Sequence, residues 1–116
     1  MQLNSQPEPS RVTKMRVARQ YPRYLFSVPV TLRHLLPDGF QTTRGVSLDI
    51  SEGGISAIVQ ANLRVGETVE INLPLSAGSL HTVAIVRHVT DSRSGFEFLG
   101  LTAEERHRIT VASRAL

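Results

Sequence analysis

Residues 26–33 read FSVPVTLR, and this stretch decides the fold because its side chains alternate with a period of two. The apolar parity comprises Phe26, Val28, Val30 and Leu32. Such alternation is typical of a strand with one face buried and the other in solvent. Because proline has no N–H to donate to a sheet ladder, Pro29 predicts an edge strand or a β-bulge.

Further strand-like segments follow this one, each separated from the next by a turn signal. Glycine, proline, aspartate and serine gather at residues 36–39, 51–54, 76–79 and 91–95, where they favour turns. The segments between them predict strands at residues 41–49, 55–59, 69–73, 80–89 and 96–98. The segment 80–89 is apolar enough to be buried on both faces.

The last fifteen residues change pattern. Thr102 and Glu105 have the spacing of a helix capping box, in which each side chain bonds the other's backbone N–H. Ile109, Ala112 and Leu116 follow at helical spacing. Six short strands and one closing helix predict a mainly β protein, a six-stranded antiparallel barrel with a C-terminal α-helix.

The N-terminal region shows neither strand nor helix periodicity up to about residue 24. We expect a flexible tail over residues 1–15, continuing into a basic arm, and one domain over 16–116. Between residues 11 and 23 there are five basic residues and no acidic one, so this segment attracts anions. Twelve of the thirteen basic residues of the chain are arginine, whose planar fork suits phosphate and guanine.

Composition bounds the class of protein. With 116 residues the chain has room for one domain, and with no cysteine it has no disulfide, thiolate metal site or cysteine nucleophile. No apolar run is long enough to span a membrane, and residues 1–10 lack the apolar centre of a signal peptide, so we expect a cytoplasmic protein. The initial methionine favours a complete chain. His81 and His88 have opposite parity on one segment, which argues against a shared metal.

Two local patterns carry chemistry. Residues 19–23 read RQYPR, with arginine at both ends, and residues 49–54 read DISEGG. If Val46, Leu48 and Ile50 point inward, Ser47, Asp49 and Ser51 point outward beside a turn with two glycines. Taken alone, Asp49 and Ser51 fit a turn cap, and the arginines fit a solvated basic tail.

Together and in this order, the two patterns resemble the PilZ family. In that family an Arg-x-x-x-Arg lies in the arm before the first strand, and an Asp-or-Asn-x-Ser-x-x-Gly ends the second. The glycine that opens the third strand, the Gly95–Phe98 segment and the closing helix extend the resemblance over residues 16–116. The resemblance implies a PilZ-type barrel that binds cyclic di-GMP, with no other cofactor and no metal.

The resemblance also implies the roles of particular residues. Arg19 and Arg23 would grip phosphate or guanine, Asp49 and Ser51 would meet a guanine edge, and Gly54 would allow close approach. Additional candidates for ligand contacts are Arg16, Tyr21, Arg44, Gly53 and Arg87. We expect one ligand molecule rather than an intercalated pair, because Ala18 precedes the first motif arginine.

Three other functions are weighed against this one. No nucleophile–base arrangement or phosphate-binding loop is visible, so we expect no enzyme and no catalytic residue. A nucleic-acid-binding barrel would need an aromatic platform, yet aromatic residues make up 5% of the chain. A protein adaptor without nucleotide remains open, although such members of the family usually lack the arginine motif. The downstream protein partner is not visible in the sequence.

Overall fold

The computed structural model describes residues 21–114, which form a closed barrel of six antiparallel strands with one short additional strand and one helix among these residues. The elements are β1 (Tyr24–Leu25), β2 (Pro29–Leu36), β3 (Gly39–Ile50), β4 (Gly54–Val59), β5 (Thr68–Leu73), β6 (Leu80–Val89), β7 (Ser94–Leu99) and α2 (Ala103–Arg114). The predicted mainly β barrel with a C-terminal helix is therefore confirmed. The predicted tail and most of the arm lie outside the described residues.

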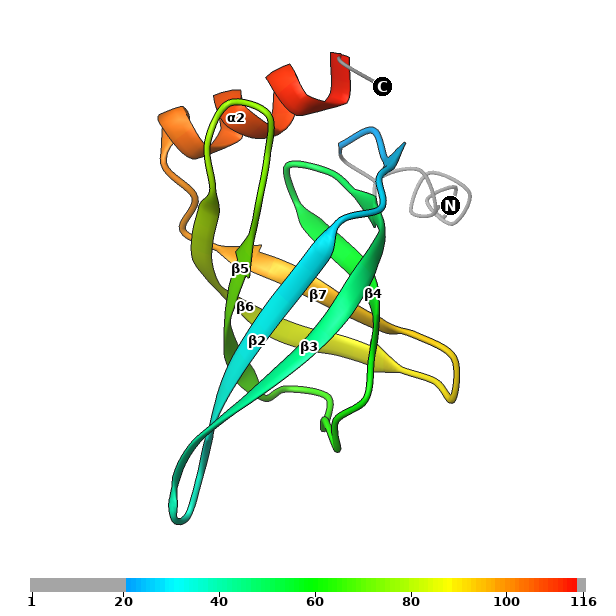
Figure 1. Cartoon of the computed structure of the whole chain (residues 1–116), viewed down its shortest axis with the longest axis vertical. Coiled ribbons are helices and arrows are strands. Elements are labelled where there is room, and N and C mark those ends of the chain that lie inside the picture. The colour runs from blue at the N-terminus through cyan, green and yellow to red at the C-terminus, as the bar shows by residue number, and fades with distance from the viewer. Residues whose placement is uncertain (1–20, 115–116) are drawn as a thin grey trace, which may run out of the picture.

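The strands follow the order β3-β2-β5-β6-β7-β4 around the barrel, and pairing of β4 with β3 closes it. β1 pairs with the C-terminal end of β3, on the side of β3 that pairs with β2 further along the strand. Figure 1 shows the helix α2 across one end of the barrel, while the β2–β3 hairpin projects from the other end. β3 is thus the strand that runs from the projecting hairpin to the end near α2.

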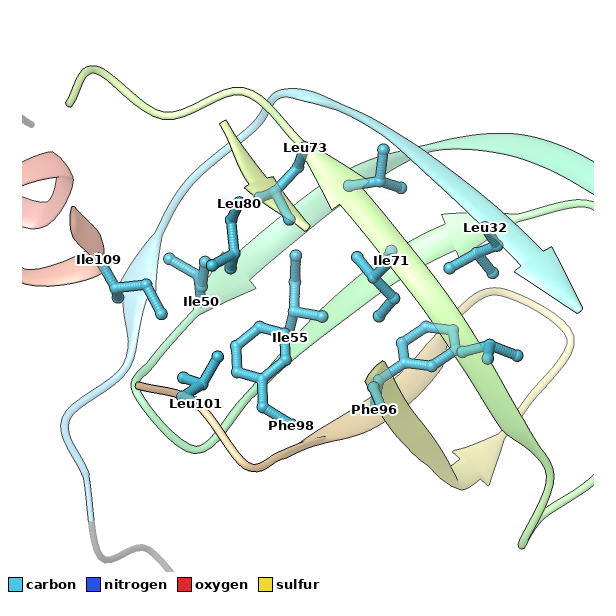
Figure 2. Packing of buried hydrophobic residues seen from close by; sticks show 14 of the residues in the cluster. Leu32, Ile50, Ile55, Ile71, Leu73, Leu80, Phe96, Phe98, Leu101 and Ile109 are labelled. Carbon is cyan, nitrogen blue, oxygen red and sulfur yellow. The ribbon is translucent and has the colours of Figure 1, made fainter. Parts of the chain in front are cut away.

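The core lies inside the barrel and extends under α2. Figure 2 shows side chains from facing strands meeting there, with Ile109 of α2 directed toward the barrel. The largest fully buried apolar side chains are Leu32, Ile50, Ile55, Ile71, Leu73, Leu80, Ile109, Val30, Val69 and Val86. Burial of these side chains is the main stabilising contribution, and it fixes which face of each strand is left for a ligand.

The capping box at the start of α2 is confirmed. The Glu105 N–H donates to Thr102 Oγ1 at 3.1 Å, and the Thr102 N–H donates to Glu105 Oε1 at 2.8 Å. Ile109 and Ala112 are buried as predicted, and Leu116 lies outside the described residues. The helix of the described chain is too short to span a membrane.

The predicted parity of β3 is wrong over part of its length. Ser47 is fully buried, whereas Val46 is 46% exposed. A β-bulge lies between Ser47 and Asp49, because Ser47 pairs with Ala57 and Asp49 pairs with Ser56. The extra residue, Leu48, inverts the alternation, so that Ser47 and Ile50 both face inward. A bulge of this kind has no simple signature in the sequence.

Two further strand predictions need correction. β2 has neighbours on both sides and is not an edge strand; Pro29 is tolerated because it is the first residue of β2, before the pairing with β5 begins at Thr31. β6 alternates buried and exposed residues over its first half instead of being buried on both faces. Phe26 and Val28 pack against the core but precede the strand that they were predicted to open.

Candidate ligand-binding site

Asp49 lies near the C-terminal end of β3, on the outer wall of the barrel. Its neighbours across the ladders are Leu25 of β1 and Ser56 of β4. Ile50, the next residue, is fully buried, so Asp49 faces the opposite way, and its side chain is 18% exposed. The outward direction predicted for Asp49 is therefore correct, although the bulge at Leu48 contributes to it.

Arg23 is brought to Asp49 by the pairing of β1 with β3. Tyr24 pairs with Ile50 and Leu25 with Asp49, which places the residue before β1 beside the end of β3. Arg23 Nη1 lies 2.5 Å from Asp49 Oδ1, and the Arg23 side chain is 33% exposed. An ion pair this accessible contributes about 0.2–1 kcal/mol to stability. Its main effect is to hold one arginine fork at a defined place on the wall.

Ser51 does not face outward with Asp49 as predicted; it is 3% exposed and caps the turn that follows β3. Its Oγ accepts hydrogen bonds from the N–H groups of Gly53 at 3.0 Å and Gly54 at 3.2 Å. The Ser51 N–H donates to the Gly54 carbonyl at 2.8 Å. Since the oxygen accepts twice, the hydroxyl proton is the group that Ser51 can offer to a ligand.

Packing requires glycine at position 54 of the turn and leaves little space at position 53. A Cβ at Gly54 would lie 2.1 Å from the Phe96 carbonyl oxygen, so only glycine lets β4 approach β7 at this position. A Cβ at Gly53 would lie 3.0 Å from Cδ2 of Tyr21, whose ring therefore covers the turn. Tyr21 and Gly53, both additional candidates, are thus brought together at the motif.

Glu52 connects the turn to α2, a contact that the sequence did not indicate. Thr110 Oγ1 lies 3.3 Å from Glu52 Oε2 and 3.1 Å from the Arg106 carbonyl oxygen, so its single proton is shared between these two acceptors. On the other side of the turn, the Phe98 N–H donates to the Gly53 carbonyl at 2.9 Å. The turn is held by β7 and by α2, so its geometry depends on the packing of the whole barrel end.

Two of the additional candidates lie away from this cluster. Arg44 is five residues before Asp49 on β3, about 17 Å along the strand at the usual rise. Arg87 is on β6, separated from β3 by β4 and β7 in the sheet, and its Nε is 2.6 Å from Glu97 Oε1. Arg16 and Arg19 lie outside the described residues.

The cluster offers hydrogen-bond acceptors and an arginine fork, without the groups of a metal site. Within residues 21–114 no three His, Asp or Glu side chains are placed to hold a metal ion. Asp49 has acceptor capacity beyond Arg23, and the Arg23 guanidinium has five N–H donors, of which the ion pair uses only part. Such an arrangement suits a flat ligand with both donors and acceptors on its edge.

The chain is similar to known proteins in both sequence and fold. The model of the family described as the PilZ domain matches residues 18–112. The PilZ domain with c-di-GMP of YcgR from Escherichia coli is 21% identical, with a TM-score of 0.68 over 84% of this chain and 90% of that one. The PilZ domain of CeSA from a cellulose-synthesizing bacterium is 21% identical, with a TM-score of 0.63 over 81% and 96%.

The Bacillus subtilis inhibitor of motility, MotI, is similar over a smaller share of its length. It is 22% identical, with a TM-score of 0.68 over 84% of this chain. The chain spans about half of that protein, 50% of its length. No curated protein matches the sequence. At these identities the solved structures show a shared fold.

Proposed function

The chain belongs to the PilZ domain family, and from this premise we propose that it is a receptor for cyclic di-GMP, a binding protein and not an enzyme. The observation that carries the proposal is the Arg23–Asp49 pair, held on the outer wall beside the capped glycine turn. Three of the similar structures are described as containing c-di-GMP: the YcgR PilZ domain, a second structure of YcgR, and MrkH of K. pneumonia.

Asp49 and Arg23 match the two edges of guanine. A carboxylate accepts from the guanine N–H donors, and an arginine fork donates to guanine O6 and N7 or to a phosphate. Because the pair already orients both side chains, the ligand does not have to order them on binding, which favours affinity. Ser51 would donate its hydroxyl proton to the ligand. Gly53 and Gly54 have no side chains that would obstruct the ligand at the turn.

The phosphates of the ligand need positive charge that this wall does not supply alone. The turn and the strand end carry two carboxylates, Asp49 and Glu52, against one guanidinium, Arg23. Arg16 and Arg19 precede this region in the sequence, and we assign them to the phosphates by the family motif. The proposed site is therefore divided: the wall recognises guanine, and the arm neutralises the anion.

This division gives the receptor a conformational response. β1 is only two residues long and pairs only with β3, so the arm before it is joined to the barrel by a short ladder. A ligand that bridges Asp49 and Arg19 would fix the arm across the wall and change the surface offered to a partner protein. We place this response in the cytoplasm, with one ligand molecule per site.

The nucleic-acid alternative is weaker than this proposal. Phe96 is 3% exposed and Phe98 is 7% exposed, so these rings belong to the core and form no stacking platform on the surface. Tyr21 covers Gly53 at the motif and is available to a cyclic dinucleotide there.

The proposal is tested by calorimetric titration of the protein with cyclic di-GMP. Saturable binding that is weakened in Asp49→Ala and Arg23→Ala supports the receptor function. Glu70→Ala is the matched control, because Glu70 is also a half-buried acidic residue of a barrel strand, yet it lies on β5 away from the motif. Absence of binding by the folded wild-type protein contradicts the proposal.

The arm response has a separate test in hydrogen–deuterium exchange. Addition of cyclic di-GMP is expected to slow amide exchange over residues 11–25, and the change should disappear in Asp49→Ala. Binding without any change of exchange in this segment would leave the receptor function intact and contradict the arm response.

A further inference from the structure

The β2–β3 hairpin projects beyond the barrel and leaves one backbone edge open (Figure 1). Residues 40–44 of β3 pair with β2 on one side, but pairing with β4 begins only at Gly45. Between residues 21 and 114 no other backbone hydrogen bond reaches residues 40–44. A strand edge of this kind offers unpaired N–H and C=O groups to another strand.

The open edge has few of the features with which proteins usually protect such edges. It reads FQTTR, with no proline and with one charged residue, Arg44. Phe40 is 59% exposed, and its neighbour across the hairpin, Leu35, is 66% exposed. An apolar pair at the tip of a projecting hairpin, beside an open edge, points to a protein partner.

The five residues are complementary to themselves when two copies run antiparallel. We propose that this edge joins two copies of the chain through a two-fold axis at Thr42. In that register Thr42 faces Thr42, Gln41 faces Thr43, and Phe40 faces Arg44 of the second copy. No like charges face each other across the ladder, and each Phe40 ring receives the guanidinium of Arg44 from the other copy.

The structure shows that the ring of Phe40 accepts such a partner. Within the chain, the guanidinium carbon of Arg33 lies 4.1 Å from the Phe40 ring centroid. This contact uses one face of the ring, and Arg44 of the second copy would approach the other face or the edge. Val46, 46% exposed on the same face of β3 as Phe40 and Arg44, is the diagonal neighbour that the second Phe40 would meet.

The register is fixed by the length of the edge. Gly39 has φ +126° at the turn, and Gly45 already pairs with Val59 of β4, so residues 40–44 are the whole of the free segment. An axis at Thr42 pairs all five residues, whereas a shifted axis shortens the ladder and brings the tip against the end of β4. Self-association through this edge leaves the ligand wall at the other end of β3 uncovered.

A single cysteine at Thr42 tests the proposal, because the chain contains no cysteine of its own. Residues facing each other across antiparallel strands have Cα atoms roughly 4.5–5.5 Å apart, within the range of a disulfide. Under mild oxidation we expect Thr42→Cys to form a covalent dimer at least about tenfold faster than Ser92→Cys, an exposed control in the β6–β7 turn. Equal rates would overturn the proposal.

A charge exchange gives an independent readout by sedimentation equilibrium of the full chain. Phe40→Arg places two arginines opposite each other and should raise the dimer dissociation constant by roughly tenfold or more. Adding Arg44→Glu creates an ion pair across the same position and should restore dimerisation. A monomeric wild type, or a folded double variant that associates no better than Phe40→Arg, would overturn the proposal; circular dichroism establishes the folding of each variant.

Discussion

The two ends of strand β3 have opposite characters. At the C-terminal end, the turn after Ile50 is capped by Ser51, covered by Tyr21 and bonded to β7 and α2. At the N-terminal end, β3 extends beyond the barrel, and among the described strands residues 40–44 pair only with β2. The first end is fixed by many contacts and suits a small ligand that needs defined geometry; the second is open and suits another strand.

The two ends of β3 should therefore differ in their tolerance to mutation. A residue of the capped turn is tied to the barrel, so its replacement should affect the free energy of unfolding or the affinity. A residue of the hairpin tip has no such ties, and, apart from the backbone strain at Gly39, its replacement should affect mainly association with a partner.

The largest expected effect is on stability, at Gly54. In Gly54→Ala the new Cβ clashes with the backbone carbonyl oxygen of Phe96. Because this carbonyl belongs to a paired strand and cannot rotate away as a side chain can, we expect a loss of about 2–4 kcal/mol in the free energy of unfolding. Urea denaturation measures it. Gly39→Ala is the control at the other end: its φ of +126° costs about 1 kcal/mol, but no atom lies within 4 Å of the new Cβ. Equal losses in both variants would remove the contrast between the ends.

The next effect concerns affinity, at Asp49. Removing the carboxylate in Asp49→Ala should lower the affinity for cyclic di-GMP by roughly 10- to 150-fold, because a hydrogen bond to a charged group contributes about 1.5–3 kcal/mol. The same variant should lose less than about 1 kcal/mol of stability, since its ion pair with Arg23 is accessible to solvent. Unchanged affinity in calorimetry, with the fold intact, would exclude Asp49 from the site.

A smaller effect on stability is expected at Ser51, the residue that caps the turn. Ser51→Ala leaves the N–H groups of Gly53 and Gly54 without their acceptor, and we expect a loss of about 1–2 kcal/mol in urea denaturation. Ser92→Ala, in the exposed β6–β7 turn, should change stability by no more than about 0.5 kcal/mol. A Ser51 variant as stable as the Ser92 variant would show that the cap is dispensable.

The smallest effect is expected at the contact between the turn and α2. Thr110→Val removes the hydroxyl that reaches Glu52, at a cost of about 0.5–1 kcal/mol. Glu52→Gln keeps an acceptor oxygen and should cost less. If thermal unfolding shows the reverse order, the contact with Thr110 is not what holds Glu52.

Period-two alternation and turn residues were enough to predict the six strands of the barrel, and the capping box with helical spacing was enough to predict the helix, because these signals are local in the sequence. The bulge at Leu48 was not predictable in this way, since the extra residue is defined by the pairing of β3 with β4. For the same reason the sequence put Val46 inside and Ser47 outside, the reverse of what is found. The strand that begins at Pro29, β2, lies between β3 and β5, and its pairing with β5 is likewise non-local.

For the candidate site, the sequence indicated which residues lie close together better than how their side chains are arranged. Asp49 and Arg23 were singled out from the motifs, and the structure brings them together through β1, a strand too short to show any periodicity. Ser51 was given an outward side chain, yet it caps the turn. The link from Glu52 to Thr110 spans 58 residues of sequence, so no local pattern could reveal it.

The wall at Asp49 is proposed to recognise guanine in a cyclic dinucleotide. Calorimetric titration of the wild-type protein with cyclic di-GMP, cyclic di-AMP and GTP tests this recognition. We expect saturable binding of cyclic di-GMP and not of cyclic di-AMP, because adenine presents no N–H donors at the position where guanine would meet the Asp49 carboxylate. Equal binding of cyclic di-AMP, or no binding of any of the three, would contradict it.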